Sequence, residues 1–285
     1  MRTYLKKTIG SLFIIFFIFG CTTQAKDSAI NYEEFINKRK IIVNISEIKK
    51  GLSRERGMTV FYMMNYSDKS IQQSLQNQRN IVDKYISSYS KHMRITKVPS
   101  KLISFTSLIN TRKKIDAQTS SFTQTLKAYQ DIEQAIDLEI ESLFSSTKNK
   151  KVDSLLTSFI NFQKLQTDVA LERDIVTFYV GKSKKIEMEN IEKLKKGIDP
   201  LNYDNILYPK IKLKISDMIK DESNADLFGD IEKLRLKLMK EGKEGSYSVQ
   251  ASQWFQLLSE QLNFINEIEY AILDAIYYKV EGLKQ

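Results

Sequence analysis

The chain is 285 residues long with a formal net charge of +9, and it contains one cysteine and one histidine. This composition excludes a disulfide framework and a metal site of several histidines or cysteines. The lysines are scattered among acidic residues and form no basic tract with interleaved aromatic side chains, so we expect no nucleic-acid partner. The only histidine, His92, is expected in solvent at a helix end. We therefore predict no enzyme, no catalytic residue, no metal and no cofactor.

Residues 1–20 have the pattern of a lipoprotein signal peptide, in which three basic residues precede the apolar residues 9–19. This apolar run of about a dozen residues is too short to span a bilayer, which needs about 20. Residues 18–21, Ile-Phe-Gly-Cys, match a lipobox. We predict that Cys21 becomes the acylated N-terminus; the alternative is an uncleaved anchor that contains a buried cysteine.

This interpretation divides the chain into a signal peptide at 1–20, a polar tether at 21–30 and a domain at 31–285. The domain is expected to be lipid-anchored to a membrane on the extracytoplasmic side of the cell envelope. Cleavage removes three cations and no anion, so the formal net charge decreases from +9 to +6. No further cysteine is present, so stability has to come from an apolar core, and about 265 residues can bury one large core or two fused ones.

Beyond residue 30, only three prolines and few glycines interrupt apolar positions of helical period, which predicts an all-α chain without a sheet. The expected helices lie at about 32–66, 70–93, 152–196, 206–220, 225–240 and 249–282. Between the second and the third of these ranges, one helix is expected to begin at Pro99, and residues 111–118 and 121–145 are expected to form one or two further elements. Long helices joined by short turns indicate antiparallel bundle packing.

Two similar stretches, Leu52–Met63 and Val169–Val180, each place a Glu-Arg pair in or beside the apolar stripe of a helix. The first stripe contains Ile41, Ile45, Ile48, Leu52, Glu55, Thr59, Tyr62 and Tyr66, with Arg56 at its edge. The second contains Leu155, Phe159, Phe162, Gln166, Val169, Arg173, Val176 and Val180. Their positions near the start of each half are typical of an internal duplication.

The arginines of these stretches have two interpretations. A buried guanidinium needs a carboxylate or a bound anion beside it. In the first interpretation, Glu55 and Glu172 neutralise Arg56 and Arg173 across the bundle. In the second, the two arginines converge on a small anion, because the planar fork of a guanidinium matches an oxyanion.

A second repeated pattern is Asn-x-Arg with an aspartate four residues later, at Arg79 with Asp83 and at Arg112 with Asp116. An arginine and an aspartate at this spacing usually form a solvated ion pair on one helix, worth a few tenths of a kcal/mol. The alternative is that Arg79 or Arg112 lines the same anion pocket from a neighbouring helix.

Taken together, these features resemble the nitrate- and nitrite-sensing (NIT) domain, an all-helical bacterial sensor module, from residue 31 to the C-terminus. The matching segments are Leu52–Gly57 (LSRERG), Leu75 with Gln78, Arg79 and Asp83, Arg112 with Ile115, Asp116 and Tyr129, Glu172 with Arg173, and Trp254 with Ile268 and Glu269. The resemblance implies two packed helical bundles with an anion pocket between them. The implied ligand is a small inorganic anion, nitrate, nitrite or similar.

Carried over to this chain, the resemblance gives Arg54, Arg56 and Arg173 as anion-binding candidates, with Arg79 and Arg112 as further ones. The sequence departs from the pattern at Asp174, where a glycine follows the first motif, and at Gln261, where the resemblance implies an arginine. Losing that cation is expected to weaken or change anion binding.

No HAMP, kinase, cyclase, methyl-accepting or RNA-binding module follows in this sequence, so we expect a separate protein partner for signal output. The alternative function is a structural or interaction lipoprotein that has kept the helical fold and lost the ligand.

Overall fold

The computed structural model describes residues 32–96, 103–143, 149–195 and 209–282, and within these ranges the regular structure is entirely helical. The predicted all-α class is therefore confirmed. The helices are α2 (Tyr32–Met64), α3 (Lys69–Thr96), α4 (Thr106–Asp116), α5 (Phe122–Leu143), α6 (Lys150–Gly181), α7 (Met188–Lys195), α8 (Pro209–Lys220), α9 (Glu222–Glu241) and α10 (Ala251–Glu281).

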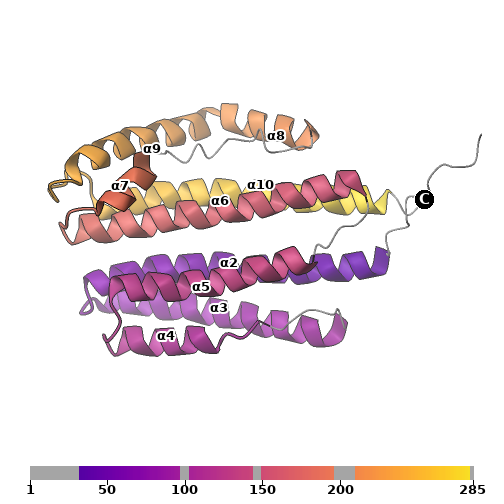
Figure 1. The fold of residues 1–285 in the computed structure, drawn as a ribbon, viewed down its shortest axis with the longest axis horizontal. Helices are drawn as coiled ribbons and strands as arrows, with labels where there is room; N and C mark the ends of the chain where they lie inside the picture. Colours follow the sequence, from indigo (N-terminus) through magenta and orange to yellow (C-terminus); the bar gives the residue numbers. More distant parts are fainter. Residues whose placement is uncertain (1–31, 97–102, 144–148, 196–208, 283–285) are drawn as a thin grey trace, which may run out of the picture.

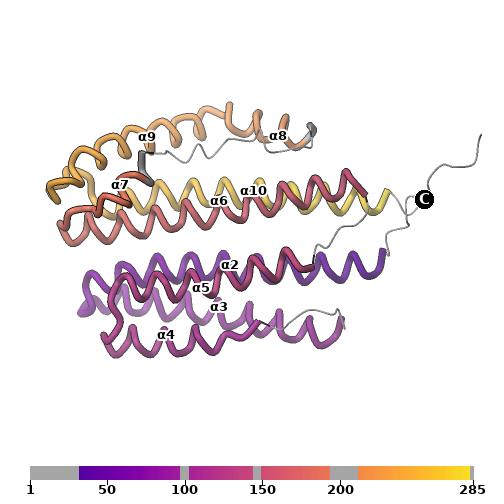
Figure 2. The backbone as a smooth tube through the Cα atoms, in the orientation of Figure 1, coloured from indigo at the N-terminus to yellow at the C-terminus, as the bar shows by residue number. Residues whose placement is uncertain are grey.

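The helices form two antiparallel bundles that lie side by side along their length. Figure 1 shows α2 to α5 in one bundle and α6 to α10 in the other. Helices α2 and α5 of the first bundle contact α6 of the second, and α2 also contacts α10. Figure 2 shows that α3 with α4 and α8 with α9 form the two outer layers. The arrangement predicted from long helices and short turns is thus observed.

Helix α2 is central because it packs against helices of both bundles. Between Ile41 and Met63 most of its residues are buried, on all sides of the helix. The buried residues include three charged ones, Lys49, Glu55 and Arg56, each with at most 1% of its surface exposed. A helix surrounded in this way leaves most of its polar side chains away from solvent, so the buried ones have to find partners inside the protein.

The structure differs from the expected elements at one turn, and at a second turn it decides between the one or two elements that the sequence left open. The predicted helix 152–196 is interrupted, because α6 ends at Gly181 and α7 begins at Met188; Ser183 between them has a left-handed φ of 48°. Gln118, with φ 54°, similarly separates α4 from α5, so this region is two elements. The expected helix start at Pro99, the stop at 197–200 and the leader with Cys21 lie outside the described residues.

None of the helices in the described ranges contains an apolar stretch of the length and hydropathy that a bilayer crossing requires.

Candidate functional site: a cationic cavity at the bundle junction

The glutamate of each Glu-Arg motif binds an arginine of its own bundle. Arg112 of α4 donates to both oxygens of Glu55, over 2.8 and 2.7 Å. Arg235 of α9 donates to both oxygens of Glu172, over 2.7 and 2.9 Å. The interpretation in which Glu55 and Glu172 neutralise Arg56 and Arg173 is therefore wrong, because the two glutamates bind Arg112 and Arg235 instead. The two halves instead repeat one geometry, a bidentate pair from a central helix to an outer one.

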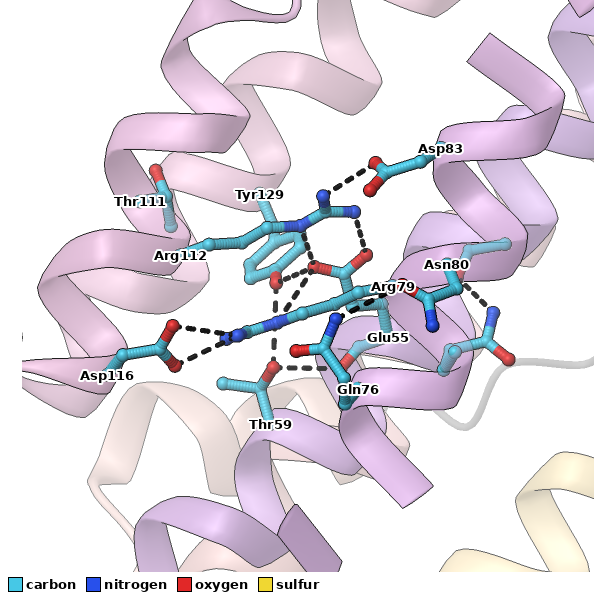
Figure 3. Close-up of polar contacts among 12 residues, drawn as sticks. Glu55, Thr59, Gln76, Arg79, Asn80, Asp83, Thr111, Arg112, Asp116 and Tyr129 are labelled. Atoms are coloured by element: carbon cyan, nitrogen blue, oxygen red, sulfur yellow. Dashed lines mark hydrogen bonds and ion pairs between the residues drawn. The ribbon is translucent and has the colours of Figure 1, made fainter. Parts of the chain in front are cut away.

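Figure 3 shows the network around Glu55 in the first bundle. The Tyr129 hydroxyl donates to Glu55 over 2.7 Å, and burial together with the adjacent carboxylate raises the pKa of Tyr129 well above its ordinary value.

Within this network, the predicted same-helix pairs of Arg79 with Asp83 and Arg112 with Asp116 are not formed. Arg79 instead donates to both oxygens of Asp116 over 2.9 Å, and Arg112 donates to Asp83 over 2.6 Å. The pairs are exchanged between α3 and α4, which joins these helices.

Arg56 and Arg173 meet on one carboxylate at the junction of the bundles. Arg56 Nε donates to Asp174 Oδ2 over 2.6 Å, and Arg173 Nε donates to Asp174 Oδ1 over 2.9 Å. All three side chains are almost completely buried. The two motif arginines thus converge, as the anion interpretation expected, but the anion between them is part of the chain.

Arg56 is further neutralised by Glu133 of α5, which accepts from its Nη1 over 2.5 Å. Burial alone would lower the pKa of Arg56, but the Glu133 and Asp174 carboxylates raise it above its ordinary value. Arg56 lines neither of the cavities described below. In this structure Arg56 therefore joins three helices, α2, α5 and α6.

Arg173 differs from Arg56 because part of its guanidinium faces a cavity. Its Nη2 donates to the Ser53 carbonyl over 2.8 Å and its Nη1 to Ser259 Oγ over 3.3 Å. The guanidinium carbon lies 4.4 Å from the centre of the Phe255 ring, which is a cation–π contact. Three helices thus fix the guanidinium in one orientation.

Gly57 makes this orientation sterically accessible. A Cβ atom at position 57 would lie 2.6 Å from Arg173 Nη2 and 2.7 Å from the Phe255 ring, closer than such atoms approach. With any other residue at position 57, the Arg173 guanidinium and the Phe255 ring would have to move out of their observed positions. This gives a physical reason for the glycine that follows the first Glu-Arg pair.

The cavity beside Arg173, which we call the inner cavity, has a volume of about 90 Å³ and lies between α2, α6 and α10. It is lined by Lys50, Ser53, Arg54, Met58, Gln166, Arg173, Phe255, Ser259, Leu262, Asn263 and Asn266. Among the described residues, three cations and no carboxylate line it. A site of on the order of 10–15 Å³ holds one water, so this volume admits a small polyatomic anion.

Lys50 and Arg54 supply the other two charges of the inner cavity, from one face of α2 at i and i+4. Arg54 is exposed and has no ion-pair partner within the described ranges. Lys50 is 6% exposed, and its ammonium lies 3.5 Å from Glu269 and 3.8 Å from Glu47 without a hydrogen bond to either. Burial raises the pKa of Glu269 to about 7. At neutral pH this carboxyl therefore compensates Lys50 only in part.

Sequence reasoning placed Arg54 and Arg173 among the binding candidates, and both line the inner cavity; it missed Lys50. The signal for Lys50 was its position four residues before Arg54, which puts the two on one helix face. Arg79 and Arg112 are held by carboxylates of the first bundle and line neither cavity. Gln261 is buried away from the inner cavity, and its amide atoms have no hydrogen-bond partner in the described residues.

His92 lies half-buried near the end of α3. The described ranges contain no group of three or more His, Cys, Asp or Glu side chains arranged to hold a metal ion.

Fold and site together define an all-helical protein of two bundles with a small cationic cavity at their junction. The family model for nitrate and nitrite sensing, NIT, matches residues 50–277, and the chain belongs to this family. Comparison with curated proteins and with solved structures finds no match. The matched range includes both Glu-Arg motifs and every residue that lines the inner cavity.

Replacing Gly57 with alanine is expected to displace the Arg173 guanidinium and the Phe255 ring. Gly229→Ala is the matched control, because a Cβ there meets nothing within 4 Å. In the control, the higher helix propensity of alanine should raise the free energy of unfolding by up to about 1 kcal/mol. Gly57→Ala has the same gain in propensity, but the displaced side chains should lower its free energy of unfolding below that of the wild type. Urea unfolding of both variants measures this. Equal stabilisation by the two substitutions would contradict the close approach.

Replacing Asp174 with asparagine leaves two buried arginines without their shared carboxylate. We expect a loss of about 3–5 kcal/mol in the free energy of unfolding. Asp230→Asn, at an exposed pair on α9, is the control. An unchanged free energy of unfolding in Asp174→Asn would contradict the bridging role.

Proposed function

We propose that this protein is a membrane-tethered, extracytoplasmic binding or sensing module for a small anion of the nitrate or nitrite type. One observation carries the proposal: Lys50, Arg54 and Arg173 face one cavity that no described carboxylate lines. Membership of the nitrate- and nitrite-sensing family supports the same ligand class.

The chemistry of the cavity suits an oxyanion. Guanidinium groups present planar N–H donors that match planar oxyanions, and they bind these more strongly than neutral donors do. Gln166, Asn263, Asn266, Ser53 and Ser259 add neutral polar groups to the same lining. A partly buried position strengthens each of these interactions relative to water.

Signal output is proposed to follow from the position of the cavity. One wall is α2 of the first bundle, and the others are α6 and α10 of the second. An anion that contacts both walls binds more tightly to the bundle packing that brings them together, and it therefore shifts the protein toward that packing. A partner protein that contacts both bundles can respond to this shift.

The proposed tether is the lipid attached to Cys21, for which the leader pattern is the support. A single acyl chain binds membranes only marginally, whereas two or more anchor a protein stably, so the multiple acylation typical of lipoproteins would hold this domain at the membrane.

A second candidate function is a structural or interaction lipoprotein that has lost its ligand. Asp174 favours it, because this carboxylate already provides Arg56 and Arg173 with a partner inside the chain. The two candidates differ in what they require of Arg54. This side chain has no partner to stabilise within the described ranges, so a purely structural role gives it no function.

Thermal melts of a soluble fragment beginning after Cys21 distinguish the two. A ligand that binds only the folded state adds about 2.7 kcal/mol at a hundredfold excess over Kd. Nitrate, nitrite, chloride and small carboxylates should give one selective shift above the general salt effect.

Arg54→Ala should change the free energy of unfolding of the unliganded protein by no more than about 0.5 kcal/mol, and it should lower the affinity for the anion about tenfold or more. Arg173→Ala should abolish the anion-selective shift in melting temperature. Arg94→Ala, at an exposed arginine of α3 outside both cavities, should change neither. If the wild-type protein shows no anion-selective shift, the anion-binding proposal is contradicted and the structural function is supported.

Replacing Cys21 with serine tests the tether separately. Cells expressing the wild-type chain should incorporate a labelled fatty acid into it, and the Cys21→Ser precursor should stay unlabelled and unprocessed, because the acceptor thiol is gone. Gel mobility and the label measure both. A wild-type chain that takes up no label would contradict the anchor and leave the anion site untouched.

A further inference from the structure

A second cavity adjoins the inner one and opens toward solvent. This outer cavity has a volume of about 330 Å³ and is lined by Glu47, Lys50, Gly51, Arg54, Tyr85, Asn263, Asn266, Glu267 and Tyr270. Four residues, Lys50, Arg54, Asn263 and Asn266, line both cavities. The two cavities are therefore adjacent compartments of one cleft, and the combined space exceeds what a four-atom anion occupies.

The two compartments differ in charge. The inner one adds Arg173 to the shared cations, whereas the outer one adds the carboxylates Glu47 and Glu267. Glu267 is exposed and forms no ion pair within the described ranges, so its charge is available to a ligand. The positive charge of the lining thus decreases from the inner end, with three cations and no carboxylate, to the outer end, where two cations and two carboxylates balance. A ligand with charges of opposite sign at its two ends matches this gradient.

The aromatic rings of the outer compartment favour a cation of the ammonium type. The Lys50 ammonium lies 3.7 Å from the centre of the Tyr270 ring and makes a cation–π contact with one face, while Tyr270 remains 42% exposed. The Tyr270 hydroxyl donates to Glu47 and thereby holds the ring beside a carboxylate. Tyr85 of α3 lines the same compartment. A carboxylate beside aromatic rings is a common arrangement for binding ammonium groups.

Lys50 connects the two compartments. It is more than nine-tenths buried, it lines both cavities, and its ammonium has no hydrogen-bond partner among the described residues. Glu269 and Glu47 lie within 3.8 Å of this ammonium but accept no hydrogen bond from it, and an incoming anionic group can supply that hydrogen bond. The anionic end of a ligand therefore has a reason to lie beside Lys50, at the boundary of the inner compartment.

We propose that the cleft binds a small zwitterion, with its carboxylate in the inner cavity between Arg173, Lys50 and Arg54, and its ammonium group in the outer cavity beside Glu267 and the tyrosine rings. The proposal rests on the anion site of the proposed function and names a ligand class for it. Simple anions then occupy only the inner half of the cleft.

Calorimetric titration of the soluble fragment tests this with matched pairs of probes: 4-aminobutyrate against butyrate, and β-alanine against propionate. The amino group should tighten binding about threefold to tenfold within a pair, the range of one exposed cation–π contact plus one exposed ion pair. Amino compounds that bind no better than their parent carboxylates would overturn the proposal.

Glu267→Gln provides a readout of opposite sign for the two ligand types. It should remove most of the advantage of the amino compounds and leave nitrate and butyrate bound equally or more tightly, because a repelling charge is gone. Glu260→Gln is the matched control, since Glu260 is an exposed residue of α10 that lines neither cavity and bonds only to Gln256. An unchanged amino advantage in Glu267→Gln would also overturn the assignment.

The two proposals fail in different ways. Nitrate binding without any amino advantage retains the anion sensor and refutes the zwitterion site. Binding of neither nitrate nor any carboxylate refutes the anion sensor itself. Preference for 4-aminobutyrate that is lost in Arg173→Ala and reduced in Glu267→Gln supports both.

Discussion

Two buried arginines from different bundles share the carboxylate of Asp174, and the packing at the bundle junction depends on this shared charge. A guanidinium stays protonated, and leaving it buried without a partner is strongly unfavourable. Arg56 belongs to α2, whereas Arg173 and Asp174 belong to α6, so the two central helices have to keep one register along their axes. Surrounding features follow from that register. Glu133 completes the neutralisation of Arg56, and the absent side chain of Gly57 leaves the space that the Arg173 guanidinium fills.

The hydrogen-bond partners of the two Glu-Arg motifs explain why the motif occurs in both halves of the chain. In each Glu-Arg motif the glutamate turns into its own bundle, where Arg112 or Arg235 binds it with two hydrogen bonds, and the arginine turns toward the other bundle. Neighbouring residues on a helix point about 100° apart, so one dipeptide can serve both interfaces of a central helix. The motif thus ties an inner helix to an outer one and one bundle to the other.

Helical periodicity was sufficient to predict the all-α class, the long central helices and the stripes that contain Glu55 and Arg173. Periodicity also placed Arg173 in the second stripe, whereas Arg54 became a candidate only through the resemblance to the NIT family. Ion-pair partners were not predictable in the same way, because spacing along one helix describes only that helix. Arg79 and Arg112 each had an aspartate at i+4, yet each binds the aspartate of the other helix. Lys50 was missed because its burial results from the contact of α2 with α10.

Asp174 also explains how this chain can keep a cationic cavity in the absence of a bound ligand. Together with Glu133 it gives Arg56 two carboxylate partners, whereas it contacts Arg173 only through Nε. The other two nitrogens of Arg173 are directed toward the Ser53 carbonyl and Ser259. Beside Lys50, burial raises the pKa of Glu269 from its ordinary 4.5 to about 7. The stability that Glu269 contributes is therefore fully present below pH 4.5 and is lost as the pH rises through 7. As this carboxyl ionises it neutralises Lys50, so the charge available to an anion increases toward mildly acidic pH. Asp174 fixes the charge at the bundle junction, and the buried Glu269 adjusts the charge beside Lys50, which lines the cavity.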